Sequence, residues 1–213
     1  SYSPIITMPR PLGSTVTPRA TEDDDTALGA DVDEEQTALR MKAKAREHEV
    51  GKKWRRAKTM YRRSAKTYSE KATTQRREGA SSKAAKLYQH AGESYGLAGD
   101  ARRSHAEYAL AAACWMDRAT HYTEAEHWEH AAESHRYAAR AYDQAGKQAE
   151  AETEYLAAAD LLYRRARNAY ERHAYEDAES LCRQAVDLAS GSSRWRLADE
   201  GRHLLHAVQK AWS

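Results

Sequence analysis

Apolar residues recur every three or four positions along most of this chain, and the whole pattern returns after a fixed interval. The small and aromatic positions of residues 84–118 match those of residues 131–165, which lie 47 positions further on. The matched positions are Ala84 and Ala131, Ala91 and Ala138, Tyr95 and Tyr142, Gly99 and Gly146, Tyr108 and Tyr155, and Ala111 and Ala158. A fixed period of this length indicates stacked supersecondary units.

Each copy consists of two amphipathic segments separated by a glycine. Before and after that glycine, the apolar positions keep the spacing of one helix face. Gly99 and Gly146 stand where a residue in the left-handed conformation would end the first helix. Each copy is therefore expected to be an αα-hairpin, and its apolar faces need neighbouring copies to cover them.

The motif Tyr88-x2-Ala91-Gly92-x2-Tyr95-x3-Gly99-Asp100, followed by Tyr108-x2-Ala111, resembles the tetratricopeptide repeat. Its Ala-Ala-x2-Tyr-x2-Ala-Gly opening is similar to the long-helix repeats of soluble NSF attachment proteins. The period is 47 rather than about 34 residues, and no repeat ends in proline. The resemblance implies an all-α, right-handed α-solenoid of stacked antiparallel helix pairs.

The pattern predicts about four repeats, near residues 38–71, 85–118, 132–165 and 179–213. The predicted helices cover residues 34–49, 52–78, 81–98, 101–118, 123–145, 148–171, 174–189 and 193–211, with no strand. Thr123 and Glu126 form a capping-box pattern, which places the start of the fifth helix at residue 123. Residues 1–33 contain all four prolines and an acidic run at 22–25, so we expect an extended tail there, before a repeat domain at 34–213.

The core must be built from few residue types, because the chain has no Phe, 13 Tyr and only 41% apolar residues. Alanine, leucine, tyrosine and tryptophan are the expected core residues. In the first repeat, the predicted buried stripe is Trp54, Ala57, Tyr61, Ala65, Tyr68 and Ala72. The two cysteines, Cys114 and Cys182, also fall on apolar positions, with a spacing unrelated to a disulfide framework.

Buried thiols are typical of a reducing compartment. No stretch approaches the roughly 20 apolar residues of a membrane span, and no signal-peptide pattern opens the chain. We therefore expect a cytoplasmic protein without a membrane span.

The net charge of +2 hides a strong asymmetry along the chain. Residues 37–86 carry 17 Lys and Arg against four Glu, whereas residues 1–36 have a net charge of −6 and residues 87–213 one of −5. This excess is larger than solubility requires, so we expect it to meet an acidic partner surface. The cations of this basic patch are Lys52, Lys53, Arg55, Arg56, Arg62, Arg63, Arg76 and Arg77.

Two Glu-x2-His spacings, Glu124 with His127 and Glu200 with His203, match the helical ligand pairs of di-iron bundles. A di-iron centre also needs a Glu from each of two further helices, whereas a solenoid spreads its helices apart. The sequence has no glycine-rich phosphate loop and no nucleophile elbow. We therefore expect no enzyme activity, no metal and no cofactor, and a di-iron enzyme is only the third hypothesis.

Nucleic acid binding is the second hypothesis, because residues 40–77 interleave positive charge with Trp54, Tyr61 and Tyr68. These aromatics lie on the predicted buried stripe, where they would be unavailable for stacking on bases. The leading hypothesis is a non-enzymatic scaffold or adaptor subunit of a multi-protein assembly. Its partners would be other protein subunits with acidic or extended segments.

The resemblance also implies a binding groove, because the first helix of each tetratricopeptide repeat lines the concave face. The candidate groove residues are Lys42, Arg46, Lys86, His90, Arg136, Arg140 and Arg183. Glu93, Glu133 and Asp187 share this face, so the expected groove is mixed but positive. The family's carboxylate clamp uses Asn at two of these positions, and no Asn occurs at them here. The resemblance therefore favours an acidic extended peptide over a chaperone C-terminus.

Overall fold

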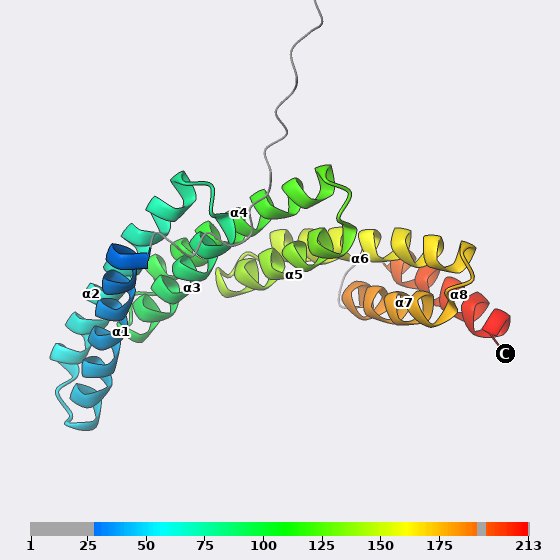
Figure 1. The fold of residues 1–213 in the computed structure, drawn as a ribbon. Helices are drawn as coiled ribbons and strands as arrows, with labels where there is room; N and C mark the ends of the chain where they lie inside the picture. Colours follow the sequence, from blue (N-terminus) through cyan, green and yellow to red (C-terminus); the bar gives the residue numbers. More distant parts are fainter. Residues whose placement is uncertain (1–27, 191–194, 213) are drawn as a thin grey trace, which may run out of the picture.

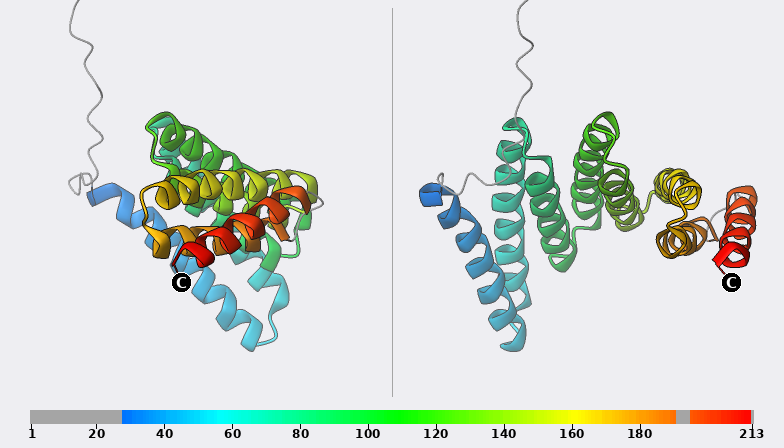
Figure 2. Two further views of the ribbon diagram at one scale, coloured as in Figure 1. Left: turned by 90° about the vertical axis from the view of Figure 1, so that its right-hand side faces the viewer. Right: turned by 45° about the vertical axis from the view of Figure 1, so that its right-hand side comes forward.

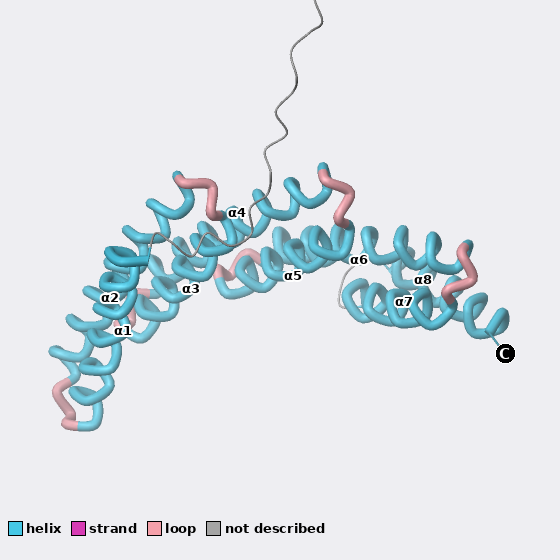
Figure 3. Tube along the Cα trace, in the orientation of Figure 1, coloured by secondary structure: helices cyan, strands magenta, loops and turns pink. Residues whose placement is uncertain are grey.

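The computed structural model describes residues 28–190 and 195–212, and every regular element in these ranges is an α-helix. These helices are α1 (Leu28–Val50), α2 (Trp54–Arg77), α3 (Ser81–Leu97), α4 (Ala101–Glu124), α5 (Trp128–Gln144), α6 (Gln148–Glu171), α7 (Tyr175–Ser190) and α8 (Trp195–Trp212). Figures 1 and 3 show them in a curved row that runs from α1 to α8. The predicted all-α class is confirmed.

Each helix packs mainly against the helix before it and the helix after it in the sequence, and α8 also touches α6. Because the links from α1 to α7 are short, consecutive helices run back and forth across the row, as Figure 2 shows. The predicted array of antiparallel helices is therefore confirmed. None of the described helices combines the length and apolar character needed to cross a bilayer.

Alanine lines most of the contacts between these helices. Ala91 in α3 and Ala138 in α5 are fully buried, as the repeat pattern predicted. Small side chains allow the helix backbones to approach closely, and Tyr61, Tyr68 and Trp115 fill the spaces that remain. The core therefore runs along the row as a series of clusters instead of a single centre.

All six loops from α1 to α7 have one residue in the left-handed conformation. These residues are Lys52, Gly79, Gly99, Glu126, Gly146 and His173, with φ between 58° and 81°. The residue after each of them donates its N–H to a carbonyl five residues back, as Asp100 does to Tyr95 at 2.9 Å. This Schellman arrangement satisfies carbonyl groups at the helix end.

These loops lead to our first testable prediction. Glycine adopts positive φ without the steric cost that a Cβ brings, which is about 1–2 kcal/mol. We therefore expect Gly99→Ala to lower the free energy of unfolding by about 1 kcal/mol and Glu126→Gly to raise it by a few tenths. Urea denaturation followed by circular dichroism measures both changes. Shifts of the same sign in the two variants would contradict this account.

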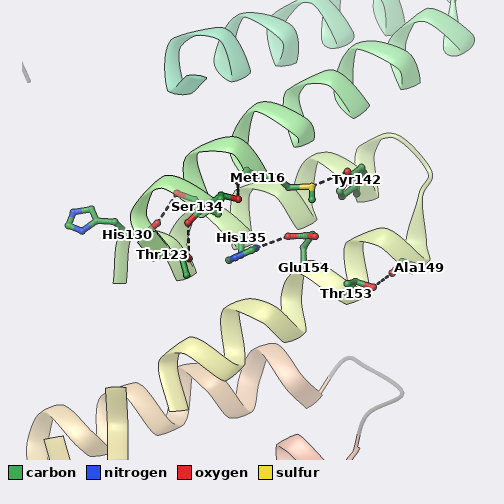
Figure 4. Close-up of polar contacts among 11 residues, drawn as sticks. Met116, Thr123, His130, Ser134, His135, Tyr142, Ala149, Thr153 and Glu154 are labelled. Atoms are coloured by element: carbon green, nitrogen blue, oxygen red, sulfur yellow. Dashed lines mark hydrogen bonds and ion pairs between the residues drawn. The ribbon is translucent and has the colours of Figure 1, made fainter. Parts of the chain in front are cut away.

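Three predicted boundaries were wrong. Helix α1 begins at Leu28 rather than at residue 34, so residues 28–33 are helical and the predicted extended tail is too long. Helix α4 continues to Glu124, and α5 begins only at Trp128. Thr123 does not cap α5, because it lies in the last turn of α4 and its hydroxyl donates to the carbonyl of Ala119 at 2.8 Å (Figure 4). The rest of the predicted tail, 1–27, and most of the break at 190–192 lie outside the described residues.

Candidate functional site

The seven predicted groove residues lie on the odd-numbered helices α1, α3, α5 and α7. All of them are exposed or half-buried. The structure therefore places them on accessible parts of alternate helices in the row. Their charges, however, are not equally available to a partner.

Two of the candidates, one on α1 and one on α3, lie close to the same carboxylate. Lys42 Nζ lies 2.6 Å from Glu93 Oε2, and only 11% of the Lys42 side chain is exposed. His90 Nδ1 is 3.9 Å from the same Glu93 oxygen, and its ring lies against Tyr68 with centroids 5.4 Å apart. Glu93, which the sequence places on this face, thus holds two of the seven candidates.

Two further candidates also have nearby partners. Arg183 Nη2 lies 2.7 Å from Glu179 Oε1 within α7. Arg46 lies near the Tyr61 hydroxyl, which donates to Glu49 at 3.1 Å. Burial raises the pKa of Tyr61, so this phenol stays neutral at physiological pH.

Three candidates remain without a partner: Lys86, Arg136 and Arg140 form no ion pair or hydrogen bond with any other described residue. Arg136 and Arg140 lie close enough to Tyr155 to lower its pKa, although burial and the hydrogen bond to Asp143 raise it more. The candidate cations without an ion pair to a described residue are therefore Arg46 on α1, Lys86 on α3, and Arg136 and Arg140 on α5.

A pocket of about 320 Å³ opens beside Arg136. Its walls come mainly from α5 and α7, and its apolar lining residues are Ala132 of α5, Leu162 of α6 and Leu181 of α7. The other lining residues are polar: Glu129, His130, Glu133, Arg136 and Gln184. Glu129 is paired with Arg165 at 2.7 Å, and Glu133 accepts a hydrogen bond from Tyr137 at 3.2 Å.

Elsewhere between α5 and α6, the two helices are joined by a polar contact between His135 and Glu154. Figure 4 shows the two side chains pointing toward each other across the helix interface. His135 Nδ1 lies 2.7 Å from Glu154 Oε2, and the Glu154 side chain is only 9% exposed. Such a largely buried contact helps to fix the relative position of the two helices.

The basic patch lies on α2 and on the loop before it. Helix α2 has nine Lys and Arg and a single Glu. Of the eight predicted patch residues, seven are exposed, whereas Arg76 is half-buried and lies 3.2 Å from Asp117. The other seven form no ion pair within the described part of the chain, so this surface remains strongly positive.

The prediction that Trp54 is buried was wrong, because 56% of this residue is exposed. Tyr61 and Tyr68 are 1% and 3% exposed, as the stripe predicted. Trp54 is the first residue of α2, at the tip of the α1–α2 hairpin, where Val50 is also 87% exposed. The stripe ends at the tip because none of the described helices lies beyond it to cover an apolar side chain.

One of the two Glu-x2-His pairs of the di-iron hypothesis does not lie on a single helix in the structure. Glu124 is the last residue of α4 and His127 lies in the following loop, so this pair does not share a helix. Glu200 and His203 are both on α8 and both exposed. Among the described residues, no group of three or more His, Cys, Asp or Glu side chains could hold a metal ion.

Cys114 and Cys182 are free and buried, on α4 and α7. Burial raises the pKa of both thiols, to about 11 in Cys182. Both are therefore protonated at physiological pH and unsuited to act as nucleophiles. This is the packing role that the sequence suggested.

The sequence analysis did not select Leu162, Leu181 or Gln184, which form much of the pocket. A signal for them exists, since a shift of 47 positions aligns Leu162 with Trp115 and Gln184 with Tyr137. The loss of two rings at aligned positions marks the place where the repeat departs from its own pattern.

No protein-family model matches this chain, and a comparison with curated proteins also finds no match. The relation to tetratricopeptide repeats therefore rests on the resemblance of the quoted motifs.

Proposed function

We propose that this chain is a non-enzymatic scaffold or adaptor, a tetratricopeptide-like right-handed solenoid that binds an extended acidic segment of a partner protein. The segment would lie along α1, α3, α5 and α7 and pair with the cations of α3 and α5. The proposal assigns the protein no catalytic residue, metal or cofactor, and it places the protein in a reducing, intracellular setting.

The helix boundaries support a 47-residue repeat. Helices α2, α4, α6 and α8 begin at Trp54, Ala101, Gln148 and Trp195, and α3, α5 and α7 begin at Ser81, Trp128 and Tyr175. In each series the successive starts differ by 47 positions. The left-handed loop residues follow the same interval, from Lys52 to Gly99 to Gly146 and from Gly79 to Glu126 to His173.

The observation that carries the proposed binding is the set of cations Lys86, Arg136 and Arg140, which have no ion pair or hydrogen bond with another described residue. A hydrogen bond between such a cation and a carboxylate contributes about 1.5–3 kcal/mol before desolvation and ordering are counted. An extended acidic segment could meet several of them in succession. On this proposal, Lys86, Arg136 and Arg140 are the cations that bind the partner, whereas Lys42 and Arg183 are already paired with Glu93 and Glu179 within the chain.

The second prediction tests this binding by reversing charge on α5. The probe is a labelled acidic peptide, acetyl-Ser-Asp-Glu-Ser-Asp-Glu-Ser-amide, and its affinity is measured by fluorescence anisotropy. We expect Arg136→Glu with Arg140→Glu to weaken binding at least about tenfold, because two attractions become repulsions. The matched control is Arg62→Glu with Arg63→Glu on the exposed face of α2, which should bind nearly as wild type does.

Equal affinities for wild type and the α5 variant would contradict the groove, as would failure of the wild type to bind any such peptide. Circular dichroism and melting temperature should be unchanged in both variants, since the four arginines have no ion pairs with other described residues.

A second candidate function is nucleic acid binding by α2, which the exposure of Trp54 favours. One stacking ring now lies at the edge of a surface with seven exposed cations, which is the combination that single-stranded binders use. A labelled 20-nucleotide single strand, tested in the same experiment, separates the two functions. If α2 binds it, the α2 control loses affinity instead of the α5 variant, and log K falls with log salt at about −0.7 per phosphate contact.

A further inference from the structure

Two aromatic pairs occupy equivalent places in the row of helices. Tyr68 of α2 lies against His90 of α3, with ring centroids 5.4 Å apart. Trp115 of α4 lies against Tyr137 of α5, with centroids 4.7 Å apart. Both partners of the second pair follow those of the first by 47 positions, so each pair joins an even-numbered helix to the next odd-numbered one in the same way.

The third place lacks its aromatic pair. The aligned residues are Leu162 of α6 and Gln184 of α7, and both of them line the 320 Å³ pocket. A leucine and an amide occupy less space than two rings and do not stack on each other. The pocket is at the lower end of the volume range of ligand sites, which suits a single large side chain.

The carboxylates that line the pocket differ in their partners. Glu129 is paired with Arg165, whereas Glu133 accepts a hydrogen bond from the Tyr137 hydroxyl and forms no ion pair with a described residue. Arg136 borders the pocket and has no ion pair or hydrogen bond with another described residue. A carboxylate that enters next to the pocket would therefore meet Arg136.

The first repeat shows what a cation at this position does when a carboxylate is present. Arg136 aligns with Lys42, two repeats earlier, and Lys42 forms a 2.6 Å ion pair with Glu93 of the next odd-numbered helix. The residue that aligns with Glu93 is Asp187 on α7, and it forms no ion pair with Arg136 in the described structure. Lys42 therefore has its carboxylate partner within the chain, whereas the aligned Arg136 beside the pocket has no such partner among the described residues.

We propose that this pocket binds an aromatic side chain of an extended partner segment, with a carboxylate of the same segment on Arg136. The incoming ring takes the place that Trp115 and Tyr137 fill in the preceding repeat. This inference rests on the proposed function and makes it specific, because it requires an aromatic residue between the acids.

The test compares two peptides that differ at one position. The first is the acidic peptide described above, and in the second its central Ser is replaced by Trp. Isothermal titration calorimetry measures both affinities for the full chain. We expect the Trp peptide to bind about tenfold more tightly, because its ring leaves water on entering the pocket.

A variant that fills the pocket provides the second measurement. Leu162→Trp with Gln184→Tyr restores the pair of the preceding repeat, so the Trp peptide should lose its advantage and bind as the Ser peptide does. Gln144→Tyr, at an exposed position on α5, is the control that adds a ring elsewhere and should keep the advantage. The comparison of the two peptides with the wild type does not depend on the folding of any variant.

Equal affinities of both peptides for the wild type would overturn the pocket inference and leave the proposed function standing. Absence of binding by either peptide would overturn both. A preference for Trp that persists at full size in the filled variant would show that the ring binds elsewhere and would also overturn the inference.

Discussion

Replacing Trp115 by alanine is expected to destabilise the protein by about 3–5 kcal/mol, as for other large aromatic residues in a core. Trp115 is 2% exposed, packs in the cluster formed by α1 to α5, and lies against the ring of Tyr137. The guanidinium of Arg118 lies 5.4 Å from its ring centroid, which adds a cation–π attraction. Trp115→Ala would leave a cavity bordered by several helices. This cavity could close only if those helices shifted relative to one another.

Trp115→Phe should lower the free energy of unfolding by roughly half as much as Trp115→Ala does. The indole N–H of Trp115 is buried and has no hydrogen-bond partner among the described residues, so its removal relieves a cost of about 1–3 kcal/mol that offsets part of the lost packing. Urea denaturation followed by circular dichroism measures both variants. A loss below about 1 kcal/mol for Trp115→Ala would show that α4 does not pack as described.

The helix starts at Ser81, Ala101 and Gln148 coincide with those predicted from the sequence. Gly99 and Gly146 mark the second and third of these boundaries, because glycine adopts positive φ readily and so ends a helix recognisably. The boundary between α4 and α5 has Glu126 in the same conformation, with φ of 59°. A glutamate gives no such signal, and with Thr123 it imitates a capping box, so the prediction failed there.

The chemistry of the candidate face could be predicted only in part. The periodic spacing of the sequence predicts that Lys42, Lys86 and Arg136 lie on alternate helices, which are α1, α3 and α5 in the structure. Whether each cation is free depends on the side chains of the neighbouring helix, which are far away in the sequence. Lys42 forms an ion pair with Glu93, 51 positions later, whereas Arg136 forms none with any acid in the described ranges. That difference follows from the helix packing in three dimensions and not from periodicity.

The pocket was accessible from the sequence in principle. The column Tyr68, Trp115, Leu162 shows the loss of a ring at an interval of 47 positions. The column does not tell whether neighbouring side chains move in to fill the space. In the structure Leu181 lines the pocket without closing it, and this result depends on packing.

The second large effect is expected at Gly201 of α8. Alanine usually stabilises a helix by about 1 kcal/mol relative to glycine, so the sequence alone predicts a gain. In the structure, a Cβ on Gly201 would overlap the hydroxyl and ring of Tyr163 from α6. We therefore expect Gly201→Ala to lower the free energy of unfolding by about 3 kcal/mol, the upper end of the usual cost of overpacking. Gly96→Ala in α3 is the control, since Gly96 is exposed and its nearest neighbour is the Ser104 hydroxyl at 3.4 Å.

A double-mutant cycle identifies Tyr163 as the cause of this loss. Tyr163 is buried, its hydroxyl has no hydrogen-bond partner among the described residues, and burial raises its pKa to about 12. Tyr163→Ala alone should therefore be costly, because it removes a buried ring. In that background the overlap is gone, so Gly201→Ala should become neutral or stabilise by up to about 1 kcal/mol through helix propensity. Urea denaturation of the four proteins gives the coupling free energy. A loss of the same size in both backgrounds would mean that α8 meets the added methyl group through some contact other than Tyr163.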